Sequence, residues 1–393
     1  MELFTLMTLM TLMTLSPEDN LRLNVLLANN IQAIRIDESK MIVYGLTERG
    51  EAKVQLHSTC RRDEQYLRQV KELIANNIKT SSGVYPLYLT NWNYTGQVKD
   101  EHLAQWLMLG EPEAVIAVMN APGLTTELAR RAWWAMPNAA NARSLLKNEP
   151  IAQSELAKEL AQYLLEYLPF EEEAINIIES VRLMLQPGLI EEEMRQQLWR
   201  KGQTKNAYLV GFLWAQPDAL PNPLPARTDA NQIQTRLAPL IAQDNMMAKQ
   251  LVKITSAAGQ TFLETCERVL RKPANQDVVN TLFAIIADYF SHIRPKDYDD
   301  DMNIFTLIER ATHLCDTCLD SSSVEQRAVL TKMPEMQDSI RAMLILSGLI
   351  SSVLRPIFSR TTVIGSLMRK KLVPITTPIF EQFAILRQSR MTY

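Results

Sequence analysis

The spacing of apolar side chains changes along the chain and predicts two kinds of secondary structure. Over residues 31–56 apolar and polar residues alternate, with polar breaks at 37–40 and 48–50. Alternation with a period of two is typical of strands that bury one face. It predicts a three-strand meander, followed by a helix over 61–77 and a further strand over 84–92, which together form a small α+β unit.

Beyond residue 97 the apolar spacing becomes helical. Prolines recur at or near the boundaries of the helical stretches, because a first turn tolerates proline and a helix interior does not. Helices are predicted over residues 99–109, 111–120, 125–136, 138–147, 152–168, 171–186, 189–200, 204–215, 228–242, 244–257, 259–271, 275–291, 303–319, 323–332, 334–356 and 375–388. The expected fold class is mainly α: a small N-terminal α+β unit, an irregular HEAT-like helical array without a strict repeat, and a C-terminal helical domain.

These patterns also predict the domain organisation. The α+β domain is expected over residues 16–97 and the helical array over 98–215. Residues 216–227 carry four prolines in twelve residues, which is typical of a linker. The C-terminal helical domain then covers residues 228–393.

The first fifteen residues differ from the rest, because Leu-Met-Thr is repeated three times in them. They lack the basic region and the small-residue cleavage site of a signal peptide. We expect this extension, residues 1–15, to be foreign to the protein, with the true start at Met7, Met10 or Met13. A helix is then expected from Ser16, its N-cap, to residue 30.

Composition narrows the class of protein further. Only four cysteines occur in 393 residues, too few for a disulfide framework, so a reducing cytoplasm is the expected location. The most apolar run, residues 342–354, is shorter than the roughly 20 residues of a membrane span. We therefore expect it to be a buried core helix and expect no membrane span.

Charge is distributed unevenly. Residues 341–393 contain eight basic residues and one acid, a net charge of +7, which leaves −10 for the remainder of the chain. Such a tail can meet nucleic acid, an acidic protein or an anionic membrane face. The favoured interpretation is that it covers an acidic face of its own protein, and nucleic-acid binding is kept as an alternative.

The one cluster that resembles a chemical site is His313, Cys315 and Cys318. The spacing of the two cysteines occurs in zinc sites, iron–sulfur sites and redox dithiols. Two thiolates are too few for a closed tetrahedral metal site, and His313 would point away from a shared helical face. We therefore favour buried, reduced cysteines and no cofactor, with a metal or redox site at Cys315 and Cys318 as the alternative.

Two adjacent tryptophans mark the candidate partner surface. Trp133 and Trp134 must face different sides of their helix, so one is expected in the core and the other in a groove or at a binding surface. Phosphate-binding loops and the common hydrolase and metalloprotease motifs are absent from the sequence, so no catalytic residues can be named.

Several whole segments, rather than reaction motifs, resemble a known family. They are Leu21–Leu56, LGEPEAV from Leu109, ELARRAWWAMP from Glu127, FEEE from Phe170, SVRLMLQPGLI from Ser180 and KNAYLVGFL from Lys205. They resemble the sulfur-oxidation family DsrS, which belongs to the gene cluster of the dissimilatory sulfite reductase that runs in the oxidative direction. The likeness covers most of residues 17–215.

The resemblance implies a cytoplasmic protein tied to sulfur oxidation, and it brings no catalytic residues. Together with the helical array, whose extended surface suits protein binding, it leads us to expect an accessory or regulatory protein that binds proteins of the sulfur-oxidation machinery. Enzymatic activity is left open.

Overall fold

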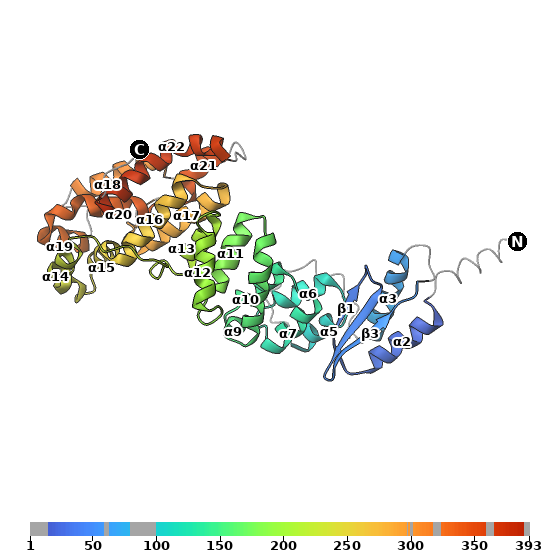
Figure 1. Ribbon diagram of the computed structural model, residues 1–393. Coiled ribbons are helices and arrows are strands. Elements are labelled where there is room, and N and C mark those ends of the chain that lie inside the picture. The colour runs from blue at the N-terminus through green and yellow to red at the C-terminus, as the bar shows by residue number, and fades with distance from the viewer. Residues whose placement is uncertain are drawn as a thin grey trace. The chain divides into compact units, whose positions relative to one another are not determined.

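The computed structural model describes residues 15–58, 63–78, 100–296, 298, 302–316, 324–358 and 365–388. The chain divides into two compact units, Met1–Tyr167 and Leu168–Tyr393. Helices dominate the described part of both units, and a three-stranded sheet lies near the N-terminus (Figure 1). The prediction of a mainly α fold with a small N-terminal α+β unit is confirmed. The strand expected over 84–92 lies outside the described residues.

The predicted meander forms an antiparallel sheet of order β1-β2-β3. The register places Ile36 opposite Val43, and Val43 opposite Val54. The elements of this part are α2 (Pro17–Ala28), β1 (Ile31–Asp37), β2 (Ile42–Thr47), β3 (Gly50–Gln55) and α3 (Asp63–Asn77). Because the order ends on β1 and β3, both are edge strands of the sheet as far as the described residues form it.

Alternation in the strands gives the sheet one buried face. Ile34, Val43 and Val54 lie on that face and form a core with apolar side chains of α2 and α3. These two helices lie on one side of the sheet in Figure 1, and the remaining helices of the first unit lie on the other. The opposite face carries Arg35 and Tyr44, which are cross-strand neighbours.

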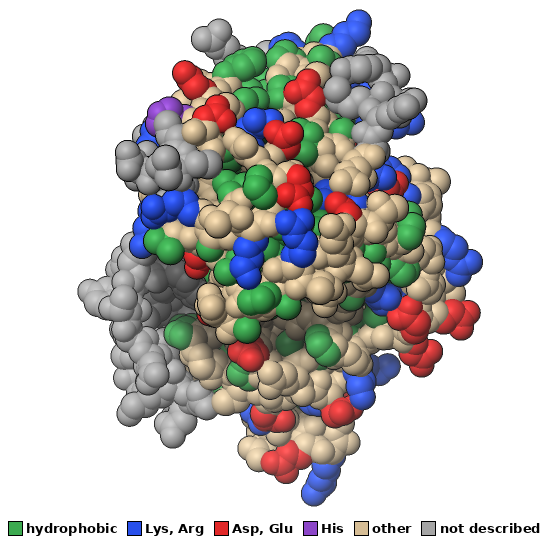
Figure 2. Space-filling view, turned by 90° about the vertical axis from the view of Figure 1, so that its left-hand side faces the viewer, with side chains coloured by type: hydrophobic (Ala, Val, Ile, Leu, Met, Phe, Trp, Pro, Cys, Tyr) green, Lys and Arg blue, Asp and Glu red, His purple; other side chains and the backbone are tan. Residues whose placement is uncertain are grey.

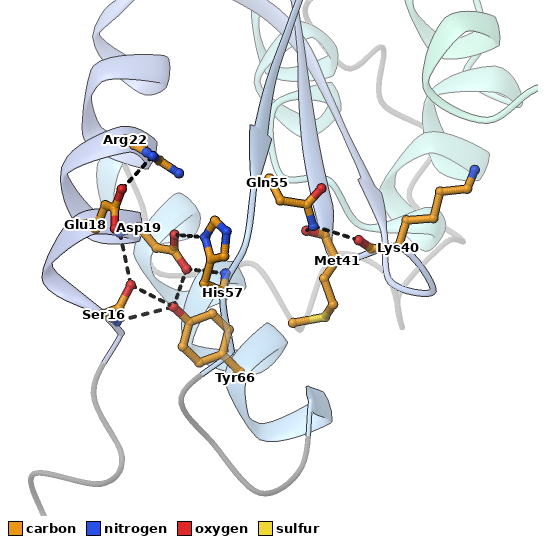
Figure 3. Close-up of polar contacts among 9 residues, drawn as sticks. All are labelled: Ser16, Glu18, Asp19, Arg22, Lys40, Met41, Gln55, His57 and Tyr66. Atoms are coloured by element: carbon orange, nitrogen blue, oxygen red, sulfur yellow. Dashed lines mark hydrogen bonds and ion pairs between the residues drawn. The ribbon is translucent and has the colours of Figure 1, made fainter.

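A buried carboxylate joins α2, the end of β3 and α3 (Figure 3). Asp19 is fully buried; its Oδ2 accepts hydrogen bonds from the Tyr66 hydroxyl at 2.6 Å and from the His57 backbone N–H at 2.7 Å. The Ser16 hydroxyl caps α2 by accepting from the Asp19 backbone N–H at 3.1 Å. The network ties together three segments that are distant in sequence.

The remaining helices of the first unit follow closely on one another. They are α5 (Asp100–Leu107), α6 (Pro112–Met119), α7 (Thr126–Ala135), α8 (Ala139–Leu146), α9 (Glu149–Ala152) and α10 (Leu156–Tyr167). Thr125 and Asn138 cap α7 and α8 with their side chains, and Pro112 opens α6, as expected for short helices.

The helices after residue 97 do not form a body separate from the sheet. Leu109 and Ala114 are part of the same core as the strands. Gly110 has a φ of +70°, and a Cβ there would lie 3.0 Å from Ile34 Cγ2, so only glycine fits this close approach. The first helices after residue 97 therefore belong to the same compact unit as the sheet, and that unit ends at Tyr167.

The described part of the second unit consists of helices and the segments that connect them. They are η1 (Leu168–Phe170), α11 (Ala174–Met184), α12 (Glu192–Lys201), α13 (Ala207–Ala215), α14 (Ala230–Ile241), α15 (Met246–Thr255), α16 (Ala257–Arg271), α17 (Gln276–Tyr289), η2 (Ser291–Ile293), α18 (Ile304–Asp316), α19 (Val324–Lys332), η3 (Pro334–Met336), α20 (Gln337–Ser347), η4 (Ser351–Leu354), α21 (Arg355–Phe358) and α22 (Gly365–Arg387). None of the helices in the described part of the chain has the length and apolar character that crossing a bilayer requires.

The proline-rich segment 216–227 lies inside the second unit and is packed against it. The Leu224 backbone N–H donates to the Thr261 hydroxyl, and the Arg227 N–H donates to the Thr255 carbonyl. Leu220 is buried. The segment thus differs from the expected linker between two domains, because its polar backbone groups find partners on α15 and α16.

Two expected helices differ in extent from the observed ones. The helix expected over 334–356 is divided, because α20 ends before Gly348 and short 3-10 segments flank it. The helix expected over 375–388 begins ten residues earlier, at Gly365, and continues through Pro374 and Pro378. Its apolar residues Met368, Leu372, Ile375 and Ile379 are buried, and this tertiary burial outweighs the helix-breaking tendency of the prolines.

Candidate functional site

A groove of about 600 Å³ lies in the first unit beside strand β1. One wall is the β1 strand and the turn that follows it, and the other is formed by the start of α6 and the residues after α7. The lining residues are Ile34, Arg35, Ile36, Asp37, Glu38, Ser39, Lys40, Tyr44, Gly110, Glu111, Pro112, Val115, Ala135, Met136 and Pro137. We call it the β1 groove.

The β1 groove follows the edge of the sheet rather than one of its faces. Side chains of successive strand residues point to opposite faces, yet Ile34, Arg35, Ile36 and Asp37 all line it. Among the strands that the structure describes, β1 pairs with β2 on one side only. An edge strand directs the N–H and C=O groups of alternate residues away from the sheet, where another strand can pair with them.

Beside the groove, Arg35 is held between two aromatic rings. Its guanidinium carbon lies 4.7 Å from the centre of the Tyr44 ring and 5.0 Å from that of Trp134. Glu51 accepts from Arg35 at 3.1 Å and from the Trp134 indole N–H at 3.1 Å. These contacts hold the end of α7 against Arg35 of β1, beside the groove.

Charged pairs join the two walls. The Lys71 ammonium lies 3.0 Å from Glu38 and 3.6 Å from Glu111. Burial works against the charge of Lys71, but these two carboxylates outweigh burial and raise its pKa. Lys71 therefore remains charged and links the β1–β2 turn to the start of α6.

The turn at the mouth of the groove carries a fixed negative charge. Asp37 accepts hydrogen bonds from the Ser39 hydroxyl at 2.7 Å and from the Lys40 backbone N–H at 3.1 Å. These bonds lower the pKa of Asp37 to about 2. The carboxylate is ionised at any pH near neutrality, so it can accept hydrogen bonds from a ligand but cannot act as a general base near pH 7.

The two tryptophans have different surroundings. Trp133 is buried; its indole N–H donates to Glu159 at 2.7 Å, and its ring meets Tyr163 edge-on at 5.0 Å. It packs α7 on α10. Trp134 is half-buried and packs on Arg35 next to the groove. Their expected partner role stays a prediction, and Trp134 is the one placed beside a groove.

The two described residues of the cysteine cluster, His313 and Cys315, have different surroundings. On α18, Cys315 is fully buried, whereas His313 is exposed. Cys318 lies outside the described residues. The described residues contain no group of three or more potential metal ligands. The alternative of a metal or redox site at His313, Cys315 and Cys318 thus stays a prediction, which metal analysis of anaerobically purified protein tests.

The chemistry of the β1 groove suits binding. Its apolar walls include Ile36, Val115 and Met136, and its charged side chains are paired across it or within its turn. Histidine and cysteine do not occur among the fifteen lining residues. Such a site can hold an extended segment by backbone hydrogen bonds and apolar contacts.

Comparison with known proteins gives no matching family model, curated protein or solved structure.

Sequence reasoning found Trp134 and missed the rest of the site. The local sequence does not mark Arg35, Glu51 or Lys71 as site residues, because each is an ordinary charged residue in its own segment. Arg35 and Trp134 are 99 residues apart, so no local spacing connects them. The signal that was present is Gly110: a glycine between two predicted helices can mark a close approach of backbone.

Proposed function

We propose that the protein is an accessory or regulatory protein of dissimilatory sulfur oxidation that binds a partner protein through the β1 groove. The binding role rests on one observation: the groove has apolar walls and runs along an edge of β1 with which no other described strand pairs. An extended peptide of the partner would add a strand to β1, and its side chains would contact Ile36 and Met136.

The sulfur-oxidation context rests on the resemblance to the DsrS family. All fifteen lining residues belong to the three resembling segments Leu21–Leu56, LGEPEAV from Leu109 and ELARRAWWAMP from Glu127. These segments are separated in the sequence but meet at the groove. A shared binding site would account for likeness in segments that carry no reaction motif.

The test is capture of a partner from cells grown on reduced sulfur, followed by an affinity measurement with the purified partner. Met136→Lys places a charge on the groove wall at a half-buried position. We expect it to weaken binding by about tenfold or more, because a charge in an apolar contact is costly to desolvate. Isothermal titration calorimetry gives the two dissociation constants.

Ile175→Lys is the matched control, since Ile175 is an exposed apolar residue on α11, outside the groove. It should bind like the wild type. A partner that binds both variants equally well would place the interface elsewhere. Failure to capture a sulfur-oxidation protein from such cells would count against the whole proposal.

A further inference from the structure

The first half of α22 carries a surface in which basic and apolar side chains are mixed. Arg369, Lys370 and Lys371 are consecutive, and Lys370 and Lys371 are exposed. Leu367 and Val373 flank them with 55% and 52% of their surface exposed. Single exposed apolar side chains are common on protein surfaces, but here two of them lie within three residues of the same cation, Lys370. We call these five residues the α22 basic face.

The geometry of α22 places Leu367, Lys370 and Val373 on the side of the helix opposite to its buried residues, with Arg369 and Lys371 on the two flanks. Met368, Leu372 and Ile375 are buried, and the helix packs on α20 and α16. At about 100° per residue, Lys370 falls between Leu367 and Val373 on the opposite side of the helix. The two apolar side chains therefore point outward on either side of a cation.

The charges of the α22 basic face are only partly used inside the protein. Elsewhere in the basic tail, Arg341 pairs with Asp338 and Arg387 pairs with Glu267. Within the part of the chain that the structure describes, Arg369 and Lys370 form no ion pair. The first turn of α22 also lacks an acid, although the N-terminal end of a helix favours negative charge.

On the face drawn in Figure 2, acidic and basic side chains are interspersed. The α22 basic face combines one sign of charge with exposed apolar groups. An anionic lipid surface matches both parts of this chemistry, because phosphate headgroups attract lysine and arginine and the interface accepts leucine and valine. Nucleic acid matches the cations but offers no place for the two apolar side chains.

We infer that the α22 basic face docks the protein reversibly on an anionic lipid surface. Arg369 and Lys370 contact headgroup phosphates, and Leu367 and Val373 insert at the boundary between headgroups and acyl chains. Binding of this kind is peripheral and falls with rising salt, since the charges involved are exposed.

The experiment is co-sedimentation of the full chain with vesicles of phosphatidylcholine that contain phosphatidylglycerol, and with vesicles of phosphatidylcholine alone. We expect binding to the anionic vesicles only. Each cation near such a surface contributes a factor of about five, so the double variant R369Q/K370Q should bind roughly 25-fold more weakly. L367S/V373S should also bind more weakly, and because it keeps both cations its binding should fall with added salt at least as steeply as that of the wild type.

The matched control is K272Q/K332Q, which removes the same charge from two exposed positions of the same unit; it should bind like the wild type. Circular dichroism melting checks that all variants are folded. Equal binding to both kinds of vesicle, or an equal loss in the control, would overturn the inference. So would affinity for a DNA duplex that R369Q/K370Q abolishes and L367S/V373S leaves unchanged, combined with no vesicle binding.

Discussion

At the scale of single residues, Asp19 of the first unit is a carboxylate without exposed surface. A carboxylate without solvent contact is costly unless it is hydrogen-bonded. Burial by itself would raise the pKa of Asp19, but the hydrogen bonds from Tyr66 and from the His57 backbone and side chain outweigh burial and hold the pKa below the ordinary value of 3.8. Asp19 is therefore ionised and stabilising near neutral pH.

Tyr66→Phe removes the shortest of these bonds and changes little in volume. We expect it to lower the free energy of unfolding by about 1.5–3 kcal/mol, the range for a hydrogen bond to a charged group. Urea unfolding at neutral pH measures the loss. Tyr44→Phe is the control, since that hydroxyl has no hydrogen bond in the network and the ring stays on Arg35; a similar loss there would contradict the assignment.

The same bond makes the effect of Tyr66→Phe depend on pH. The pKa of Asp19 is lowered in the folded state, so its contribution is fully present above 3.8 and is lost as the pH falls through the folded value. The difference in stability between wild type and Tyr66→Phe should shrink over that acidic range. A difference that is constant down to the acid transition would show that the bond is not charge-assisted.

Trp133 and Trp134 are adjacent but should differ in their cost when truncated. Trp133→Ala leaves a cavity between α7 and α10, and we expect a loss of about 3–5 kcal/mol. Trp134→Ala removes a half-buried ring from Arg35, for which about 1–2 kcal/mol is expected. Denaturant unfolding of both variants gives the comparison, and equal losses would mean that Trp134 belongs to the core.

At the scale of elements, the connection between α5 and α6 fixes the groove. Gly110 and Gly123 both have positive φ angles, +70° and +77°. Only at Gly110 would a Cβ meet other atoms, namely Ile34 and Ile36. Replacing each glycine by alanine therefore distinguishes two effects on stability. Gly123→Ala measures the cost of a positive φ alone, and Gly110→Ala adds the cost of the close approach to β1.

We expect Gly123→Ala to cost about 1 kcal/mol, the usual penalty for a positive φ. Gly110→Ala should cost about 1–3 kcal/mol more, because it forces the helix connection away from β1. Thermal unfolding of the two variants measures the difference, and partner binding in the β1 groove should weaken in Gly110→Ala alone. Equal melting temperatures would mean that the side chains of Ile34 and Ile36 can move away from the new methyl group without loss of stability.

Most elements were predictable, because local chemistry sets their ends. Asn138, Asn245 and Asn275 cap helices with their side chains, and the meander follows directly from alternation. The exceptions are α20 and α22, where burial of apolar side chains overrides local preference. The end of the helix before Gly348 and the continuation of a helix through two prolines cannot be predicted without knowing which side chains pack against these segments.

At the scale of the whole molecule, the boundary after Tyr167 has a direct test. α13 packs on α16 and α17, so it belongs with the C-terminal helices although it precedes the proline-rich segment. A fragment of residues 168–393 should unfold in one cooperative thermal transition. A fragment of residues 228–393 lacks α13 and should lose that cooperativity, because faces of α16 and α17 become exposed.

Calorimetry of the two fragments distinguishes the outcomes. A cooperative transition for residues 228–393, at the temperature found for residues 168–393, would restore the boundary at the proline-rich segment. The sequence could not decide between these divisions, since prolines that pack against a neighbouring helix and prolines that span solvent look alike in composition.

Local periodicity, capping and turn chemistry are encoded within a few residues, and they determined the mainly α class, the meander and most helix positions here. The β1 groove, the hydrogen-bond network around Asp19 and the position of Trp134 depend on residues tens of positions apart in the sequence. Their proximity follows from how the helices bury their apolar faces against the sheet, a competition among many packings that no single segment contains.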